Sequence, residues 1–377
     1  MLPFGDPAKL KTKRIVFEDV FIAHDSGTLE QLKELSSKRK VIEESINESS
    51  FITEAIAREM SGGLTSRFEQ DLQKLEQYLP LLENLVFHVD LDGSNRRMVW
   101  WTSDLKIRWA SALCSSSFFN ILGPKFFQID SLRFELNMTL FLYGAILRER
   151  ALEVLPADLV QSATLFRKAA GVYNYLAHEV LPSLQPVLAA ERPPEADSYL
   201  CLAMSFICLA EAQAVTIKKA EEKGNTGGLL TMLHYGVKQL LDEAAVILDK
   251  TGERKDISSR LVDFISACKA FHELKSQKYL SEGLKISGRV GDAVGILRRA
   301  LTKAEKKMPV EELWRSVFRQ EVNDVGGMLR KLEHENDFVW HEKVPAEDEL
   351  PLVDGKKIVS FIPYHPQRWE RELVFKI

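Results

Sequence analysis

The stretch Ser259–Lys307, SRLVDFISACKAFHELKSQKYLSEGLKISGRVGDAVGILRRALTKAEKK, predicts two helices joined by a short glycine-containing turn. Ala267 and Ala270 are small residues that allow a second helix to approach closely. The aromatic rings of Phe271 and Tyr279 have the size to fill the groove between the two helices. The stretch therefore indicates a packed helix hairpin.

The same helical spacing of apolar residues continues on both sides of this hairpin. It predicts helices at about 104–121, 130–149, 157–181, 197–222, 228–250, 257–283, 288–307 and 311–335, with Gly- or Pro-containing breakers between them. The hairpins resemble tetratricopeptide repeats, although a strict 34-residue period is absent and the helices are longer. The predicted fold is mostly α, a helical solenoid in which each hairpin buries its apolar stripe on the next.

The first hundred residues predict a different mixture of elements. Helices are expected at Asp25–Asn47, capped by Ser26 or Thr28, and at Ser66–Val86, kinked or ended near Pro80. The following LVFHVDLDGSNRRMVWW suggests two short strands around a DGSN turn. The strand-like KKIVSFIP near the C-terminus could pair with them, which gives a small β-sheet near the N-terminal part.

Composition excludes several classes of protein. The chain has 377 residues and a net charge of −4, which argues against a general nucleic-acid binder. Its four cysteines form no CxxC pair, so reduced thiols are expected. Neither a secretory signal nor an apolar run of about 18 residues is evident. We therefore expect a soluble intracellular protein.

The motifs that carry common chemistries are missing from the sequence. His272 and His341 are each followed by Glu, but positions 276 and 345 are Ser and Pro, so the second zinc-binding His is absent. No phosphate-binding loop or GxSxG elbow occurs. Cys114 fits a core position better than a nucleophile. We expect no catalytic residues, no metal, no cofactor and no small-molecule substrate.

The order of several segments resembles the Bro domain, or Bro-one domain, family, whose members include Alix and Brox. These segments are MLPF, KTKRIVFEDVF, QYLPLLENL followed by VWWTSDL, and FELNMTLFLYGAILRERA with ATLFRKAAGVYNYLAHEVLPSL. The most specific is NDFVWHEKVP, residues 336–345, which is similar to a segment at the end of the family's solenoid. The resemblance covers about residues 1–365, and the length is that of a single-domain Brox-type member.

This resemblance implies a curved, boomerang-like single domain over residues 1–365. It would comprise N-terminal helices and a small sheet to about 103, the solenoid to about 335, and a strap and strand over 336–365. Residues 366–377 would form a C-terminal tail. In the family, the Val344–Pro345 segment is a structural strap that runs from the last helix toward the sheet. His341 would then be packed and hydrogen-bonded rather than catalytic.

The resemblance also implies a non-enzymatic adaptor. Family members bind the C-terminal amphipathic helix of ESCRT-III subunits of the charged multivesicular body protein type, so the protein would be cytoplasmic and peripherally associated with endosomes. Basic runs such as RRALTKAEKK could contact acidic membranes. A terminal prenylation Cys is absent, which leaves membrane attachment open. The alternative is a generic helical-repeat scaffold that binds a different peptide.

The family's partner-helix groove can be placed on this chain through LAEAQAVTIKKA, residues 209–220. The alignment puts Thr216 where the family has a bulky aromatic residue. Leu229 and Leu233 fall on two aliphatic positions of the next helix. Loss of an aromatic ring at Thr216 would remove apolar contact worth about 1–2 kcal/mol, so binding would be weaker or the partner different.

Helical geometry examines this groove independently of the resemblance. One stripe of the helix that begins near Gly228 has the spacing of a core face: Leu230, Val237, Leu241, Ala244 and Leu248. Leu229, Leu233 and Leu240 lie roughly 60–100° to one side of it. An apolar arc of this width fits a groove that accepts a partner helix. It fits burial by a third element of the same chain equally well.

Overall fold

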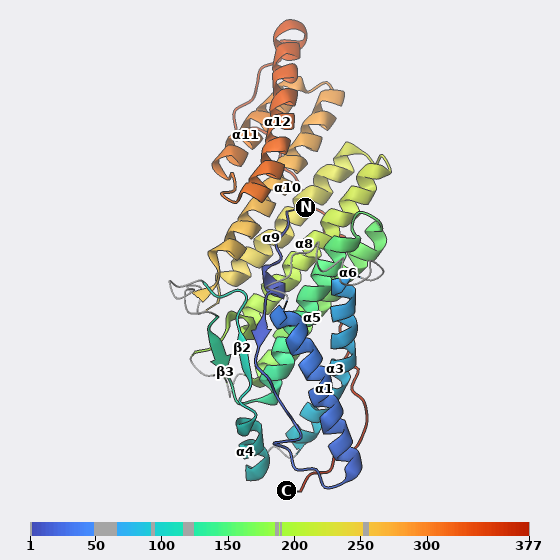
Figure 1. Ribbon diagram of the computed structural model, residues 1–377. Helices are drawn as coiled ribbons and strands as arrows, with labels where there is room; N and C mark the ends of the chain where they lie inside the picture. Colours follow the sequence, from blue (N-terminus) through green and yellow to red (C-terminus); the bar gives the residue numbers. More distant parts are fainter. Residues whose placement is uncertain are drawn as a thin grey trace.

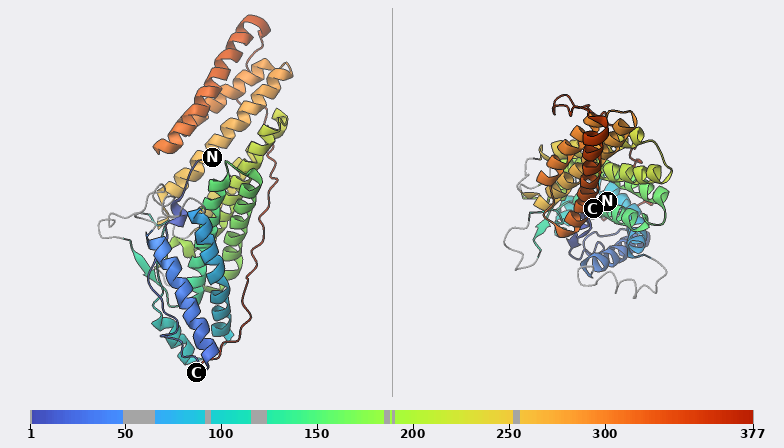
Figure 2. Two further views of the ribbon diagram at one scale, coloured as in Figure 1. Left: turned by 45° about the vertical axis from the view of Figure 1, so that its right-hand side comes forward. Right: turned by 90° about the horizontal axis from the view of Figure 1, so that it is seen from above.

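The computed structural model describes residues 2–48, 66–91, 95–115, 124–184, 188, 191–251 and 256–376. Helices dominate, and they form an elongated, bent array (Figures 1 and 2). Their bounds are Ser26–Glu48 (α1), Arg67–Leu91 (α3), Arg96–Asp104 (α4), Leu132–Val154 (α5), Leu159–Tyr175 (α6), Leu181–Leu184 (α7), Ser198–Glu222 (α8), Gly227–Leu248 (α9), Ser259–Ile286 (α10), Val290–Lys306 (α11) and Glu312–Glu335 (α12).

Side-chain caps fix where several of these helices begin. The carboxylates of Asp158 and Asp197 accept backbone N–H bonds at the starts of α6 and α8, and the hydroxyl of Thr226 does so at α9. At α1 the cap is Asp25, which accepts from the N–H of Thr28 at 2.7 Å, so the predicted Ser26 or Thr28 cap is wrong. Between residues 130 and 335 the predicted helices are confirmed.

Each helix of the solenoid packs on the next one, from α5 and α6 through α8, α9, α10 and α11 to α12. One buried apolar cluster joins the N-terminal elements to α5–α10, and a second lies between α10, α11 and α12. Because α10 contributes to both clusters, the solenoid is continuous. The mostly α solenoid with a small sheet is therefore confirmed.

The small sheet lies elsewhere in the sequence than predicted. Strands Lys11–Thr12 (β1), Arg108–Ala110 (β2) and Phe126–Gln128 (β3) pair antiparallel in the order β1-β2-β3. Lys11 is opposite Ala110, and Trp109 is opposite Phe127. The predicted helix at 104–121 is thus wrong at β2, and its last residues, 116–121, lie outside the described residues.

The predicted strand pair over residues 85–101 is also wrong. α3 continues through Pro80 to Leu91, and α4 contains the tryptophans that were expected in a strand. Asn95 caps α4 by accepting from the N–H of Arg97, and Met98 and Trp101, three residues apart, bury one face of the helix. The predicted turn at 92–94 lies outside the described residues.

A buried carboxylate attaches the sheet to the helices. Glu135 of α5 is fully buried and accepts hydrogen bonds from the Trp109 indole of β2 at 2.6 Å and from the Tyr78 hydroxyl of α3 at 3.1 Å. It also pairs with the fully buried Arg39 of α1. A buried charge is tolerated when it is paired and hydrogen-bonded in this way, so the network fixes α1, α3, α5 and the sheet relative to one another.

The C-terminal strap, residues 342–376, runs back along the helices in an extended conformation (Figure 2). It forms no strand with the sheet, so that prediction is wrong, and it ends beside α1, where Phe375 bridges to Ala23. His341 precedes the strap with a left-handed φ of 52°, and its N–H donates to the Asn336 carbonyl. Its side chain is exposed, so the expectation of a packed His341 is wrong.

Glycines in three helices let the strap backbone approach closely. A Cβ on Gly171 of α6 would lie 1.8 Å from the carbonyl oxygen of Ile362. The corresponding distances are 2.3 Å from Gly236 of α9 to the Lys356 oxygen and 2.4 Å from Gly291 of α11 to the Lys343 oxygen. Real Cβ atoms are not found at such distances, so no larger residue fits these positions without displacing the strap.

Gly236→Ala is expected to lower the free energy of unfolding by about 1–3 kcal/mol, because the added methyl overlaps the strap backbone. Gly228→Ala on the same helix is the matched control. Its Cβ would meet nothing within 4 Å, so this change should leave stability unchanged or raise it by up to about 1 kcal/mol. Urea unfolding of both variants measures the difference, and equal effects would contradict the role of the close approach.

Candidate partner-binding surface

The helix hairpin α8–α9 carries all four residues predicted to form a groove. A short turn joins the two helices, and Gly224 within it takes a left-handed φ of 68°. The predicted core face of α9 is confirmed, since all five of its members are buried: Leu230, Val237, Leu241, Ala244 and Leu248. The apolar arc therefore has the orientation that helical geometry predicted.

The structure places the four predicted groove residues in two environments. Thr216 and Leu229 are half-buried at the surface. The Thr216 hydroxyl donates to the carbonyl of Ala212, one turn earlier in α8, at 2.9 Å. Leu233 and Leu240 are each only 3% exposed. Two of the four residues are thus accessible to a partner, and two are covered.

The strap crosses the same part of α9. It contacts the helix at Met232, whose carbonyl accepts from the N–H of Lys356, and at Glu243, which pairs with Lys357. Leu233 and Leu240 belong to the main buried apolar cluster. Burial by the protein's own packing, which the sequence left open, therefore holds for these two side chains.

Gln213 of α8 joins both helices to the strap. Its amide nitrogen donates to the carbonyl of Leu233 at 2.8 Å and to that of Lys356 at 2.9 Å, and its amide oxygen accepts from the N–H of Ile358 at 3.0 Å. The side chain is fully buried. Sequence reasoning missed this role, because nothing in the local pattern indicates a partner more than 140 residues away.

Some side chains of α8 and α9 next to the crossing remain accessible. We use the name open groove for the set formed by Thr216 on α8 with Leu229 and Met232 on α9. Met232 follows Leu229 by three residues and so shares its helix face, and its side chain is 38% exposed. The sequence contained this signal, but Met232 was not predicted.

A buried polar network lies behind the open groove. The Nδ1 atoms of His234 on α9 and His272 on α10 are 3.0 Å apart, so one ring donates and the other accepts. His234 Nε2 lies 3.4 Å from the carboxylate of Glu221, which also accepts from the Tyr279 hydroxyl at 2.8 Å. The network ties the end of α8 to α9 and α10.

Burial keeps both imidazoles neutral. Desolvation, followed by the charges of His234 and Lys275, lowers the pKa of His272 well below its ordinary value. Desolvation also lowers the pKa of His234, although its hydrogen bond to Glu221 opposes this. The hydrogen bond from His234 lowers the pKa of Glu221 to about 2. Near neutral pH the network thus holds two neutral rings and one carboxylate.

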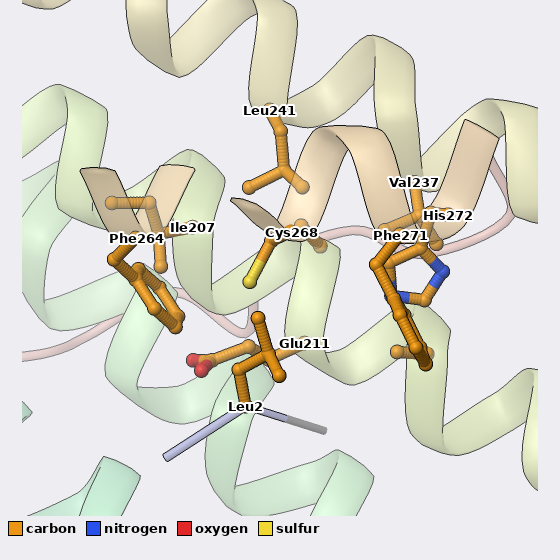
Figure 3. Close-up of a pocket in the computed structure, with 11 residues that line it drawn as sticks. Leu2, Ile207, Glu211, Val237, Leu241, Phe264, Cys268, Phe271 and His272 are labelled. Atoms are coloured by element: carbon orange, nitrogen blue, oxygen red, sulfur yellow. The ribbon is translucent and has the colours of Figure 1, made fainter. Parts of the chain in front are cut away.

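Side chains of α8, α9 and α10 line a small internal cavity (Figure 3). A cavity of about 20 Å³ is lined by apolar side chains together with Glu211, Cys268 and His272. It has space for about one water molecule. Glu211 is already occupied by a bidentate pairing with the buried Arg148. This region is a packed core rather than a substrate site.

Over the described ranges, no three His, Cys, Asp or Glu side chains gather into a group that could hold a metal ion. The four cysteines are free, and Cys201 and Cys208 are buried. α8 has the length and apolarity of a membrane span, but most of that stretch is buried, which is usual for a core helix.

His272→Gln is expected to weaken the pH dependence of stability between pH 6 and pH 5. Below about pH 6.5 the histidines of the unfolded chain become protonated, whereas His272 of the folded chain stays neutral. The free energy of unfolding therefore decreases as the pH decreases. Each such histidine contributes about 1.4 kcal/mol per pH unit. Protonation of Glu221 lowers the stability at lower pH, between about pH 4.5 and pH 2.

Urea unfolding at several pH values measures this slope. The His272→Gln slope should be smaller than that of the unchanged chain by about 1.4 kcal/mol per pH unit. His365→Gln, at an exposed position, serves as the control and should preserve the slope. An unchanged slope in His272→Gln would show that this imidazole titrates in the folded chain.

Comparison with known proteins gives matches over most of the chain. A family model described as the BRO1-like domain matches residues 35–376. The BRO1 domain-containing protein BROX of Homo sapiens is 29% identical over 211 residues, which cover 52% of this chain and 50% of that protein. The vacuolar-sorting protein BRO1 of Saccharomyces cerevisiae is 26% identical over 331 residues, 82% of this chain and 34% of that protein.

Solved structures share the fold. The structure described as the ALIX BRO1 CHMP4C complex aligns with a TM-score of 0.69 at 17% sequence identity, over 94% of both chains. A structure on endosomal targeting by the Bro1 domain aligns with a TM-score of 0.64 at 17% identity, over 94% of this chain and 91% of that one. In the matched regions, this chain spans half or less of the human and yeast relatives.

Proposed function

This chain belongs to the BRO1-like domain family, and on that premise we propose that it is a non-enzymatic adaptor for the ESCRT-III system. Its partner would be the C-terminal amphipathic helix of a charged multivesicular body protein. A BRO1 domain of the same fold is known in a complex with CHMP4C. The protein would act in the cytoplasm, peripherally associated with endosomes, in sorting or membrane remodelling.

The observation that carries this proposal is the accessible apolar surface of the open groove. Leu229 and Met232 present apolar atoms to solvent beside Thr216. An amphipathic helix that binds at the open groove would bury its apolar side against these residues and leave its polar side in water. Leu233 and Leu240 are buried in the apolar cluster of the same helices and would not contact the partner directly.

Thr216 limits how tightly such a helix is held. The aligned family position carries a bulky aromatic residue, whose ring would supply contact worth about 1–2 kcal/mol. Thr216 offers one methyl group, and its hydroxyl already donates within α8. We therefore propose that this chain binds its partner helix with lower affinity than family members with the aromatic residue do, or that its partner helix has a different shape. Basic surface residues would add a screened attraction to acidic membranes.

Leu229→Asp is expected to weaken binding of an ESCRT-III C-terminal helix peptide at least tenfold, because a carboxylate would be desolvated in the contact. Leu229 is half-buried, so the fold should survive the change. Val246→Asp is the matched control, since Val246 lies on the same helix at 57% exposure and outside the open groove. Calorimetry measures both affinities.

Three outcomes of that experiment are distinguishable. Loss in Leu229→Asp alone supports the groove. Equal affinity of the peptide for the unchanged chain and for Leu229→Asp would show that the peptide binds somewhere other than the open groove. Failure of a panel of ESCRT-III helices to bind the unchanged chain favours the generic scaffold with another peptide partner.

Thr216→Phe is expected to tighten binding of the same peptide about five- to thirtyfold, because the ring would restore the missing apolar contact. Thr216→Ser, which keeps the hydroxyl without the methyl group, should bind no more tightly than the unchanged chain. If Thr216→Phe weakens binding, the alignment of α8 with the family helix is out of register.

A further inference from the structure

A separate cleft lies between the strap and the helices α3 and α5. Its lining residues are far in the sequence from those of the open groove. Its volume is about 950 Å³, which is at the upper end for ligand pockets. Residues 364–370 form its outer wall, anchored where the N–H of Trp369 donates to the Pro80 carbonyl at 3.3 Å. The lining residues come from α3, α5 and the strap: Glu76, Leu79, Pro80, Tyr143, Tyr364, Pro366, Gln367, Arg368, Trp369 and Glu370.

Three aromatic rings face this cleft, and the hydroxyl groups of two of them donate to acidic side chains. The rings of Tyr143 and Tyr364 are 6.3 Å apart in an edge-to-face arrangement, and Trp369 supplies the third ring. The Tyr143 hydroxyl donates to Glu76 at 3.1 Å, and the Tyr364 hydroxyl donates to Glu83 at 2.7 Å. A phenol that donates to a carboxylate gains negative charge on its ring, which strengthens attraction to a cation.

The cleft also offers hydrogen-bond acceptors that the fold leaves underused. Glu76 is exposed at the wall. Pro80 has no N–H, so the Glu76 carbonyl loses its normal helical donor. Carboxylate, carbonyl and ring faces all favour a positively charged ligand.

Two guanidinium groups near the cleft already have partners. Arg368 of the lining lies 3.7 Å from the centre of the Phe87 ring and pairs with Glu370 at 3.5 Å. Arg371 lies 4.5 Å from the centre of the Trp369 ring. Glu76 forms its hydrogen bond with Tyr143 rather than with a basic side chain, so the carboxylate of Glu76 and the rings of Tyr143 and Tyr364 are the groups left for a cation.

We propose that this cleft binds an alkylammonium group of the kind carried by a lysine side chain. The ammonium would donate to Glu76 while it lies against the rings of Tyr143 and Tyr364. Its alkyl stem would pack on Leu79 and Pro80. A compact ammonium with three N–H donors suits separate acceptors better than the planar guanidinium of arginine does. A quaternary ammonium would have no N–H for the carboxylate.

NMR titration of the full chain with N-acetyl-lysine N-methylamide tests this proposal. The norleucine analogue has the same stem without the charge and is the ligand control. We expect the lysine probe to shift the Trp369 indole signal, assigned by its loss in Trp369→Leu, with saturation. The norleucine probe should cause no saturable shift. Equal binding of both probes, or no shift at concentrations on the order of tens of millimolar, would overturn the proposal.

Two variants locate the binding. Glu76→Gln and Tyr143→Leu should each weaken binding of the lysine probe about fivefold or more, followed through the Trp369 indole signal. Trp100→Leu is the control, because Trp100 is an exposed tryptophan on α4, outside the lining. Affinity that is unchanged in both cleft variants would place the ammonium elsewhere and refute the site. The result does not depend on ESCRT-III binding at the open groove.

Discussion

The close approach of the strap backbone to the helices is the constraint on which the rest of the structure depends. An extended segment can lie flat on a helix only where no side chain separates the two backbones, and Gly171, Gly236 and Gly291 provide those places. Through them one segment contacts α6, α9 and α11 and continues to α1. A solenoid stabilised mainly by contacts between neighbouring helices thereby gains a connection along its length.

The strap borders both candidate binding surfaces. It crosses α9 at Met232, and Gln213 fixes the position of the crossing. In the same part of α9, Leu233 and Leu240 are buried, whereas Leu229 and Met232 keep accessible apolar atoms. Farther along, residues 364–370 form a cleft with α3 and α5 while Trp369 stays hydrogen-bonded to Pro80. One extended segment thus lies at both candidate binding surfaces.

The sequence predicted the solenoid well because long helices repeat their apolar spacing many times. It predicted the N-terminal elements poorly. The strands contain two or three residues each, too few to show alternation. The aromatic residues near Trp101 have the composition of a strand, although Asn95 caps a helix there. The core face of α9 was predictable from its period. That Leu233 and Leu240 would be buried by the chain's own packing was not, because an apolar arc shows that side chains are covered but not whether the chain or a partner covers them.

The central claim is that a partner helix lies at the open groove while the strap stays in place, and methionine-methyl NMR tests it most directly. The chain has eight methionines, of which Met232 alone belongs to the open groove as defined here. With the methyl groups labelled with ¹³C, an ESCRT-III C-terminal helix peptide should shift the Met232 signal, assigned by Met232→Leu. The signals of buried Met204 and of Met328 on α12 should stay in place. A saturable shift elsewhere with Met232 unchanged would contradict the account.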